Sequence, residues 1–377
     1  MQTPLEESTR RRHRDKLLFL MFGGAIAIVL LVVASYQLVE FTDSPAFCGR
    51  LCHQVMYPEY TAYQVSPHSR VSCSECHVGS GADYLVRSKI SGMPMVFNTL
   101  LQSYHRPIQT PVDNLRPARE TCENCHRPDK FSGDLVRTHV SYQPDEINTE
   151  KVDTRVLRVG GGASDAARDI HWHIAADVWY LPLDKARNEI AWVGVDTGDG
   201  ALTEYVDAAK SAGVTPELLE KEKRLMDCID CHNRATHVFK SPEQLIDQGL
   251  AEGRIDKALP YIKREASKAL DPANPSLDEA MAKIEAIGEF YRVSYPRVYE
   301  ERRDSINIAI DELKEVARLT TFPDMNVSWQ SYPSNLGHLQ SPGCFRCHGK
   351  LVATGREKVG QKIDAGCDSC HYILAPK

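Results

Sequence analysis

The chain has 377 residues, of which 42% are hydrophobic, and it carries a formal net charge of −6. This length and apolar content are enough for two or three domains with packed cores. The negative charge argues against nucleic acid as a partner and suits either a basic protein partner or simple solubility.

An apolar run of 23 residues, Leu17–Val39, contains no charged side chain and is long enough to cross a bilayer as a helix. Five basic residues lie between positions 10 and 16, while Glu40 and Asp43 follow the run. We therefore expect a cytoplasmic tail (1–16), a membrane anchor (17–39) and the remainder outside. A cleaved signal at Val32-Val33-Ala34 is the alternative, but the apolar run exceeds a usual signal core of about 7–15 residues.

All twelve cysteines fall into six close pairs, and a histidine follows each pair directly. The first group, Cys48/Cys52/His53, has one residue more between its cysteines than the others. The other five have the spacing C-x-x-C-H and are Cys73/Cys76/His77, Cys122/Cys125/His126, Cys228/Cys231/His232, Cys344/Cys347/His348 and Cys367/Cys370/His371.

C-x-x-C-H is the attachment signature of c-type haem, in which two thiols bind the porphyrin and the histidine binds iron as the proximal ligand. A zinc site would use a second nearby pair, and a redox dithiol would not recur six times with a fixed histidine. For Cys48 and Cys52 a local disulfide is the alternative. The pattern predicts six covalent haem c groups, and thus a multihaem cytochrome c.

The first three motifs lie in one haem-dense domain, residues 44–126, and the first is close to the predicted membrane surface. Residues 127–227 contain no motif; the alternating stretches 154–159 and 189–195 predict strands of a small β insert that supplies distal histidines. The run Gly160-Gly161-Gly162 lacks a following Gly-Lys-Ser/Thr, so it predicts a flexible turn and not a phosphate loop.

The fourth motif occupies residues 228–240, and a helical segment follows over 241–335. Ser241 and Pro242 predict an N-cap and first helical position. Helix-period residues from Ser276 to Leu319 are interrupted near Pro296, which predicts a helical hairpin bracing the last two haems in 336–377. The expected fold is thus a single N-terminal transmembrane helix and a mainly α-helical or irregular, haem-packed domain with a small β insert.

Seven histidines remain after the proximal ligands and His13, and they are close in number to the distal positions of six haems. Bis-histidine ligation would make such haems low-potential electron carriers. His171 and His173 flank Trp172, so on a strand they would face one side and only one is expected to bind iron. The seven candidates are His68, His105, His139, His171, His173, His237 and His338.

The sequence resembles the NapC/NirT family of membrane-anchored quinol dehydrogenases, which includes the NrfH partner of nitrite reductase. The resemblance rests on the anchor helix, Phe47-Cys48, the stretch from Ser66-Pro-His68 to Cys76-His77, and the stretch from Cys228 to His237. It covers residues 17–126 and the surroundings of the fourth motif. It implies that His68 binds the third haem and His237 the second, each from the distal side.

The resemblance also implies that Lys89 binds a quinol headgroup beside the first haem, and Asp83 or Tyr84 could accept its protons. The extra residue in the first motif, Met56 one position later than in the family, and Met95 in place of an acidic residue depart from its pattern. The first haem is therefore expected to have Met56 or Met95 as a ligand, or to be five-coordinate.

The expected function is oxidation of menaquinol or ubiquinol from the quinone pool at the outer face of the bacterial cytoplasmic membrane. Electrons would pass through six haems in the periplasm to a periplasmic or extracellular acceptor, such as another cytochrome or a reductase. Residues 127–227 and 241–377 resemble larger multihaem relatives from bacteria that export electrons. The alternatives are a terminal reductase with an open-coordination haem and a passive relay subunit of a larger respiratory complex.

Overall fold

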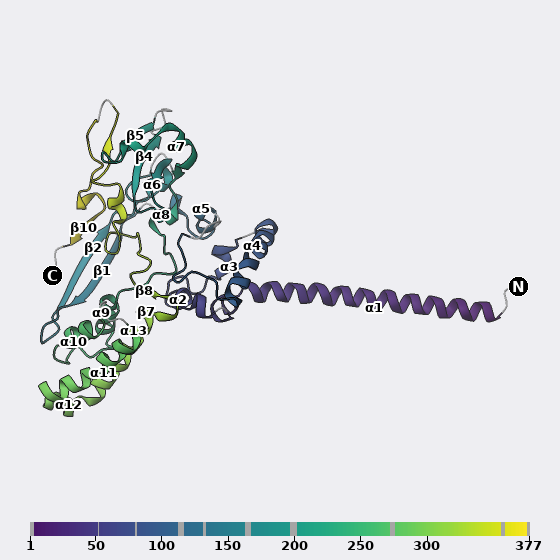
Figure 1. Ribbon diagram of the computed structural model, residues 1–377, viewed down its shortest axis with the longest axis horizontal. Coiled ribbons are helices and arrows are strands. Elements are labelled where there is room, and N and C mark those ends of the chain that lie inside the picture. Colours follow the sequence, from purple (N-terminus) through teal and green to yellow (C-terminus); the bar gives the residue numbers. More distant parts are fainter. Residues whose placement is uncertain are drawn as a thin grey trace.

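A computed structural model describes residues 4–51, 53–79, 81–111, 117–130, 133–162, 167–196, 202–271, 276–355 and 359–374. Helix α1 (Pro4–Asp43) projects as one rod from an elongated folded body (Figure 1). Its stretch His13–Asp43 is the one helix among these residues that is long and apolar enough to span a membrane, and none of its most apolar part is buried by protein. An apolar helix with no protein around it is suited to a lipid environment.

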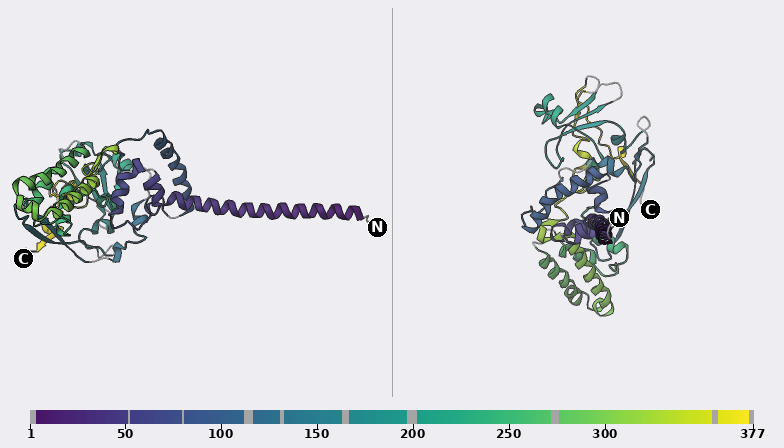
Figure 2. Two further views of the ribbon diagram at one scale, coloured as in Figure 1. Left: turned by 90° about the horizontal axis from the view of Figure 1, so that it is seen from below. Right: turned by 90° about the vertical axis from the view of Figure 1, so that its right-hand side faces the viewer.

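Short helices follow α1 at the end of the body from which α1 departs. They are the π-helix η1 (Phe47–Leu51), α2 (His53–Gln64), α3 (Cys73–His77), the longer α4 (Ala82–Leu100) and α5 (Ala118–Cys122). Ser72 and Glu75 form a capping box that starts α3, because each side chain satisfies a backbone N–H of the other residue. Figures 1 and 2 show α4 beside the C-terminal end of α1.

Two antiparallel sheets lie at the opposite side of the body. The first has the order β1-β2-β10, with β1 (Leu135–Tyr142), β2 (Glu150–Leu157) and β10 (His371–Leu374). The second has the order β6-β3-β4-β5-β9, from β3 (Val178–Pro182), β4 (Ile190–Asp196), β5 (Leu202–Val206), β6 (Arg224–Leu225) and β9 (Val352–Ala353). The predicted strands correspond to β2 and β4, and one strand from the C-terminal region, β10 or β9, forms an edge of each sheet.

The helical segment has the boundaries that its capping residues predict. Helix α9 (Pro242–Ala251) begins after Ser241, whose hydroxyl accepts a hydrogen bond from the Gln244 amide at 3.2 Å. Helices α10 (Ile262–Ala269), α11 (Leu277–Ser294), α12 (Pro296–Glu301) and α13 (Arg303–Thr320) follow, with Pro296 at the predicted interruption. Buried apolar side chains such as Ile284 and Leu313 form the largest core cluster between these helices.

The prediction that this helical hairpin braces the last two haem motifs is wrong. Helices α11 and α13 pack with α9 and α10, and the same core cluster includes Tyr142 of β1. In Figure 1 these helices form the lower end of the body, whereas the C-terminal motifs lie near the sheets. Helical periodicity identifies an apolar face but not its partner, and here that partner is provided by α9, α10 and β1.

Candidate functional site: a row of paired histidines

The second to fifth motifs are each folded as about one helical turn. The motif histidine donates its backbone N–H to the carbonyl of the first cysteine at 2.8 Å for His126 and His232 and 3.1 Å for His348, whereas His371 of the sixth motif begins β10. Residues three and four apart lie on the same side of such a turn. The local geometry therefore presents both thiols and the imidazole to one side, as attachment to a single porphyrin requires.

Three of the predicted haem cysteines, Cys76, Cys125 and Cys367, are exposed, whereas the other described cysteines are partly buried. An attachment thiol would be expected to lie inside the fold, and Cys125 does not. Its backbone N–H still donates to the Cys122 carbonyl at 3.2 Å, so the turn of the third motif is formed. The exposure of Cys125 is compatible with its predicted role, because a porphyrin bound to the thiol would itself cover the apolar surface there.

Five motif histidines lie opposite a histidine from elsewhere in the chain. Every such pair joins one motif histidine to one of the seven distal candidates. The ring centres are separated by 6.0 Å in His126–His68, 6.2 Å in His77–His237, 6.5 Å in His232–His171, 5.8 Å in His348–His173 and 6.4 Å in His371–His338.

These separations fit one iron between two imidazoles. With metal–nitrogen bonds of about 2.0–2.1 Å, as zinc sites have, rings on opposite sides of a metal have centres about 6 Å apart. An ordinary aromatic contact covers the same range but would not join a motif to a non-motif histidine five times. Among the described residues no group of three or more His, Cys, Asp or Glu side chains is arranged to hold a metal ion.

Backbone carbonyls orient several of these rings through Nδ1. An Nδ1–H that donates to a carbonyl fixes the tautomer and leaves Nε2 free to bind a metal. The contacts are His68 to Ala235 at 3.3 Å, His173 to Ile170 at 2.8 Å, His237 to Glu59 at 3.0 Å and His348 to Asp364 at 2.5 Å. Both distal and motif histidines are thus held in the orientation that an axial ligand needs.

Desolvation favours the neutral form of five of the paired imidazoles. Desolvation lowers the pKa of His77, His171, His173, His232 and His237, because burial disfavours the charged imidazolium. The neutral form has the free lone pair that iron requires.

The prediction that His171 and His173 lie on a strand is wrong, and the structure gives each of them a motif partner. His171 is the N-cap of the short helix α6 (Trp172–Ala175), and His173 is in its first turn. Residues two apart on a helix point in widely different directions, so His171 faces His232 and His173 faces His348. His105 and His139 are exposed, and no described contact places either against a motif histidine.

Cysteines of each motif lie close in space to cysteines of the next motif along the chain. A hydrogen bond between the Cys48 and Cys73 thiols raises the pKa of Cys48 and lowers that of Cys73 to about 7. Cys122 and Cys228 have the same kind of contact. Burial raises the pKa of Cys76, Cys231 and Cys370. Cysteines of a neighbouring motif raise these pKa values further. Cys122 and Cys125 act on Cys76, and Cys344 acts on both Cys231 and Cys370. The motifs therefore form one series, from the first beside α1 to the sixth beside β10.

The first motif is described only in part. Cys48 lies in η1, whereas Cys52 and the side chain of His53 fall outside the described residues. The eleven described cysteines form no disulfide with one another. Of the two candidate ligands, Met56 packs beside a core cluster that contains Val55, and Met95 is exposed on α4.

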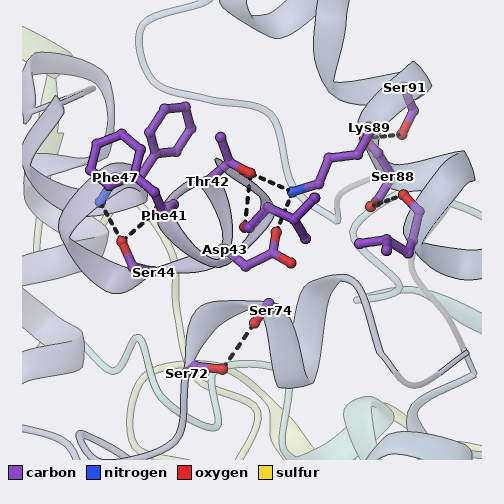
Figure 3. Close-up of polar contacts among 12 residues, drawn as sticks. Phe41, Thr42, Asp43, Ser44, Phe47, Ser72, Ser74, Ser88, Lys89 and Ser91 are labelled. Carbon is purple, nitrogen blue, oxygen red and sulfur yellow. Dashed lines mark hydrogen bonds and ion pairs between the residues drawn. The ribbon is translucent and has the colours of Figure 1, made fainter. Parts of the chain in front are cut away.

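Lys89 joins α4 to the end of α1 near the first motif (Figure 3). Its Nζ donates to the Thr42 hydroxyl at 2.9 Å and forms an ion pair with Asp43. The charges of Asp43 and Lys89 raise and lower the pKa of Cys48, respectively, so both act on the first motif. A polar cluster of Lys89, Thr42 and Asp43 thus stands where the apolar part of α1 ends.

The two predicted proton acceptors, Asp83 and Tyr84, lie at the start of α4. Asp83 is in its first turn, next to Gly81, and the Tyr84 hydroxyl lies 3.5 Å from the Glu120 carboxylate. The sequence reasoning treated Asp43 only as a charge flanking the membrane run. Its position four residues after Val39 could have marked it as a group near the lipid surface.

A buried polar network connects the fourth and fifth motifs. Asp230, within the fourth motif, accepts hydrogen bonds from the Tyr180 hydroxyl at 2.6 Å and Arg187 at 2.9 Å. Arg346, within the fifth motif, donates to the backbone carbonyls of Asp230 at 2.5 Å and Arg187 at 2.8 Å. No sequence signal identified this network, because its members are far apart along the chain.

Comparison with known proteins gives a family match and a relative. Residues 10–110 match the model of the NapC/NirT cytochrome c family, N-terminal region. The chain is 42% identical to cytochrome c-type protein ImcH of Geobacter sulfurreducens over 368 residues, which are 97% of this chain and 72% of that protein. No solved structure matches the chain.

Proposed function

Because the chain belongs to the NapC/NirT family of c-type cytochromes, we propose that it is a hexahaem quinol dehydrogenase of the bacterial cytoplasmic membrane. It takes electrons from menaquinol or ubiquinol and passes them along six haem c groups to a periplasmic or extracellular acceptor. The basic residues at positions 10–16 lie in the first turns of α1, before its apolar run, and they support a cytoplasmic N-terminus with the haem domain in the periplasm.

The observation that carries this proposal is the row of histidine pairs that begins at the membrane end of the molecule. Five pairs have the separation of bis-histidine iron ligands, and bis-histidine haems carry electrons without binding substrate. The cysteine contacts arrange the motifs in sequence order. A terminal reductase would instead need an open iron far from the membrane.

The Lys89 cluster supplies the polar groups that quinol oxidation requires. A haem held by the first motif would supply one-electron chemistry, while the two quinol hydroxyls must each lose a proton. The Lys89 ammonium can donate a hydrogen bond to a quinol oxygen, and a carboxylate can accept a hydroxyl proton. Asp43 lies against Lys89, and Asp83 and Tyr84 of the same helix remain further candidates. The protons leave to the periplasmic side.

Quinol-driven haem reduction by the purified, full-length protein tests the proposal. We expect Lys89→Ala to slow reduction by a menaquinol analogue at least tenfold, while reduction by dithionite stays complete. The matched control is Arg87→Ala, which removes an exposed cation from the same helix.

Two results would contradict the proposal. Absence of quinol-driven reduction in the native protein would favour a passive relay that receives electrons from another membrane subunit. A second high-spin haem in paramagnetic resonance spectra, remote from the first motif, would favour a reductase.

A further inference from the structure

Helix α4 carries an exposed apolar stripe along its whole length. Val86, Ile90, Met93, Phe97 and Leu100 follow one another at intervals of four, three, four and three residues, which places them on one face. Their side chains are between 57% and 74% exposed. Five large apolar side chains in one exposed line form a patch of the kind that marks an interaction surface.

Polar side chains line one flank of the stripe. Arg87, Ser91 and Asn98 are exposed and lie about a third of a helical turn from the centre of the stripe, while Met95, which is 61% exposed, lies opposite it. From Ile90 to Leu101 the helix contains no charged residue. A helix with an apolar stripe, a polar face and charges near one end has the pattern of a helix that lies in a membrane interface.

The location of α4 identifies what covers the stripe. Thr42 is three residues beyond the apolar run of α1, so it lies about 5 Å past the end of that run at 1.5 Å per residue. Lys89, at the edge of the stripe, donates a hydrogen bond to Thr42 and forms an ion pair with Asp43. The two contacts hold α4 at the level where α1 leaves the hydrocarbon and enters the headgroup layer.

Lipid fits this position better than a second protein chain. Helix α1 is bare of protein along its most apolar part, so a bilayer that α1 crosses would extend to the neighbouring surface. Helix α4 lies at the end of the folded body from which α1 departs (Figure 2). A cation such as Lys89 or Arg87 beside the stripe suits the anionic headgroup region.

We propose that α4 is a second membrane-binding element, whose Val86–Leu100 stripe lies in the outer leaflet while Arg87, Ser91 and Asn98 face the headgroups and water. Together with α1 it fixes the tilt of the haem domain over the bilayer. This holds whether or not the protein oxidises quinol, since it depends only on the exposed stripe and its attachment to α1.

Photocrosslinking of the full-length, haem-loaded protein in phospholipid nanodiscs tests this inference. The photoreactive residue p-benzoylphenylalanine is placed at Phe97, in the stripe, or at Asn98, on the polar face. A second matched pair, at Ile90 and Ser91, covers the case in which the Phe97 variant fails to load haem. Mass spectrometry of the irradiated protein then identifies what each position touches.

We expect phospholipid adducts at Phe97 and Ile90 in at least fivefold higher yield than at Asn98 and Ser91. Equal yields at the paired positions would overturn the proposal, as would the absence of lipid adducts. A crosslinked dimer at Phe97 would overturn it as well, because the stripe would then bind a second copy of the chain.

Discussion

The imidazole of His173 has two contacts that determine its direction. Its Nδ1 lies 2.8 Å from the Ile170 carbonyl, and its ring faces that of His348. Desolvation lowers its pKa, so the ring stays neutral at physiological pH. We therefore expect His173→Ala to open one axial position and convert one proposed haem from low spin to high spin, by paramagnetic resonance.

His139→Ala is the control for that substitution, because His139 is exposed on β1. The low-spin signals should remain unchanged in this variant. A high-spin signal from His139→Ala, or its absence from His173→Ala, would show that the pairing of rings does not reflect iron ligation.

The Glu59 carboxylate is positioned to influence the reduction potential of one proposed haem. Its carboxylate lies 3.3 Å from His237 Nδ1 and 3.0 Å from Arg234. A carboxylate next to a ligand histidine increases electron donation to iron and so favours the ferric state. Glu59→Gln should raise the midpoint potential of the proposed second haem by a few tens of millivolts, since tenfold in a one-electron equilibrium is about 59 mV.

Spectroelectrochemical titration measures this shift, and Glu75→Gln provides the comparison. Glu75 is an exposed carboxylate of the second motif that accepts a hydrogen bond from the Ser72 amide at 3.0 Å. An equal shift in both variants would point to a general field effect in place of the contact with His237.

For single residues, the sequence predicts those features that depend only on neighbours along the chain. The spacing C-x-x-C-H identifies the motif histidines, because all atoms involved lie within one helical turn. The pairing of His338 with His371 or His171 with His232 is not local, since it depends on how distant segments fold together. Only the resemblance to a family gave partners for His68 and His237.

Among the elements, the turn before the fifth motif depends on one glycine. Gly343 has φ of +51°, and a Cβ added there would lie 1.5 Å from the Gly337 carbonyl oxygen. The turn thus brings two backbone segments into a contact that any side chain would prevent. Gly343→Ala should destabilise the protein by more than about 3 kcal/mol, because it combines a clash with left-handed backbone strain.

Urea unfolding followed by visible circular dichroism measures that loss, and loss of one haem mass in the purified variant would reveal the same defect earlier. Gly213→Ala is the control, because nothing lies within 4 Å of its added Cβ. We expect this change to remain within about 0.5 kcal/mol. Similar effects of the two substitutions would contradict the role of the Gly343 turn.

Element predictions succeeded where capping and alternation are strong. Ser241, Ser276 and Pro296 mark helix boundaries, and the alternating stretches become β2 and β4. The sheets themselves were only partly predictable, because β9 has two residues and β10 begins at a motif histidine. Such short strands have too little periodicity to be recognised, and only the finished sheet stabilises them.

At the scale of the molecule, the order of the motifs gives the proposed electron path a direction. The first motif adjoins the membrane helix, and the sixth lies at β10, which pairs with β2 of the three-stranded sheet. Arg346 and Asp230 connect the fourth and fifth motifs through buried hydrogen bonds. We therefore expect electrons to enter at the first site and to leave at the sixth.

Removal of the sixth site alone tests this direction. In the triple variant Cys367→Ala, Cys370→Ala and His371→Ala, we expect five haem masses and quinol-driven reduction of the remaining haems at the native rate. Transfer to an added soluble acceptor should fall at least tenfold, because the exit would then be the fifth site, where both paired histidines, His173 and His348, are partly buried, whereas His338 of the sixth site is exposed. Stopped-flow spectroscopy separates the two phases, and an undiminished transfer rate would place the exit at an earlier haem.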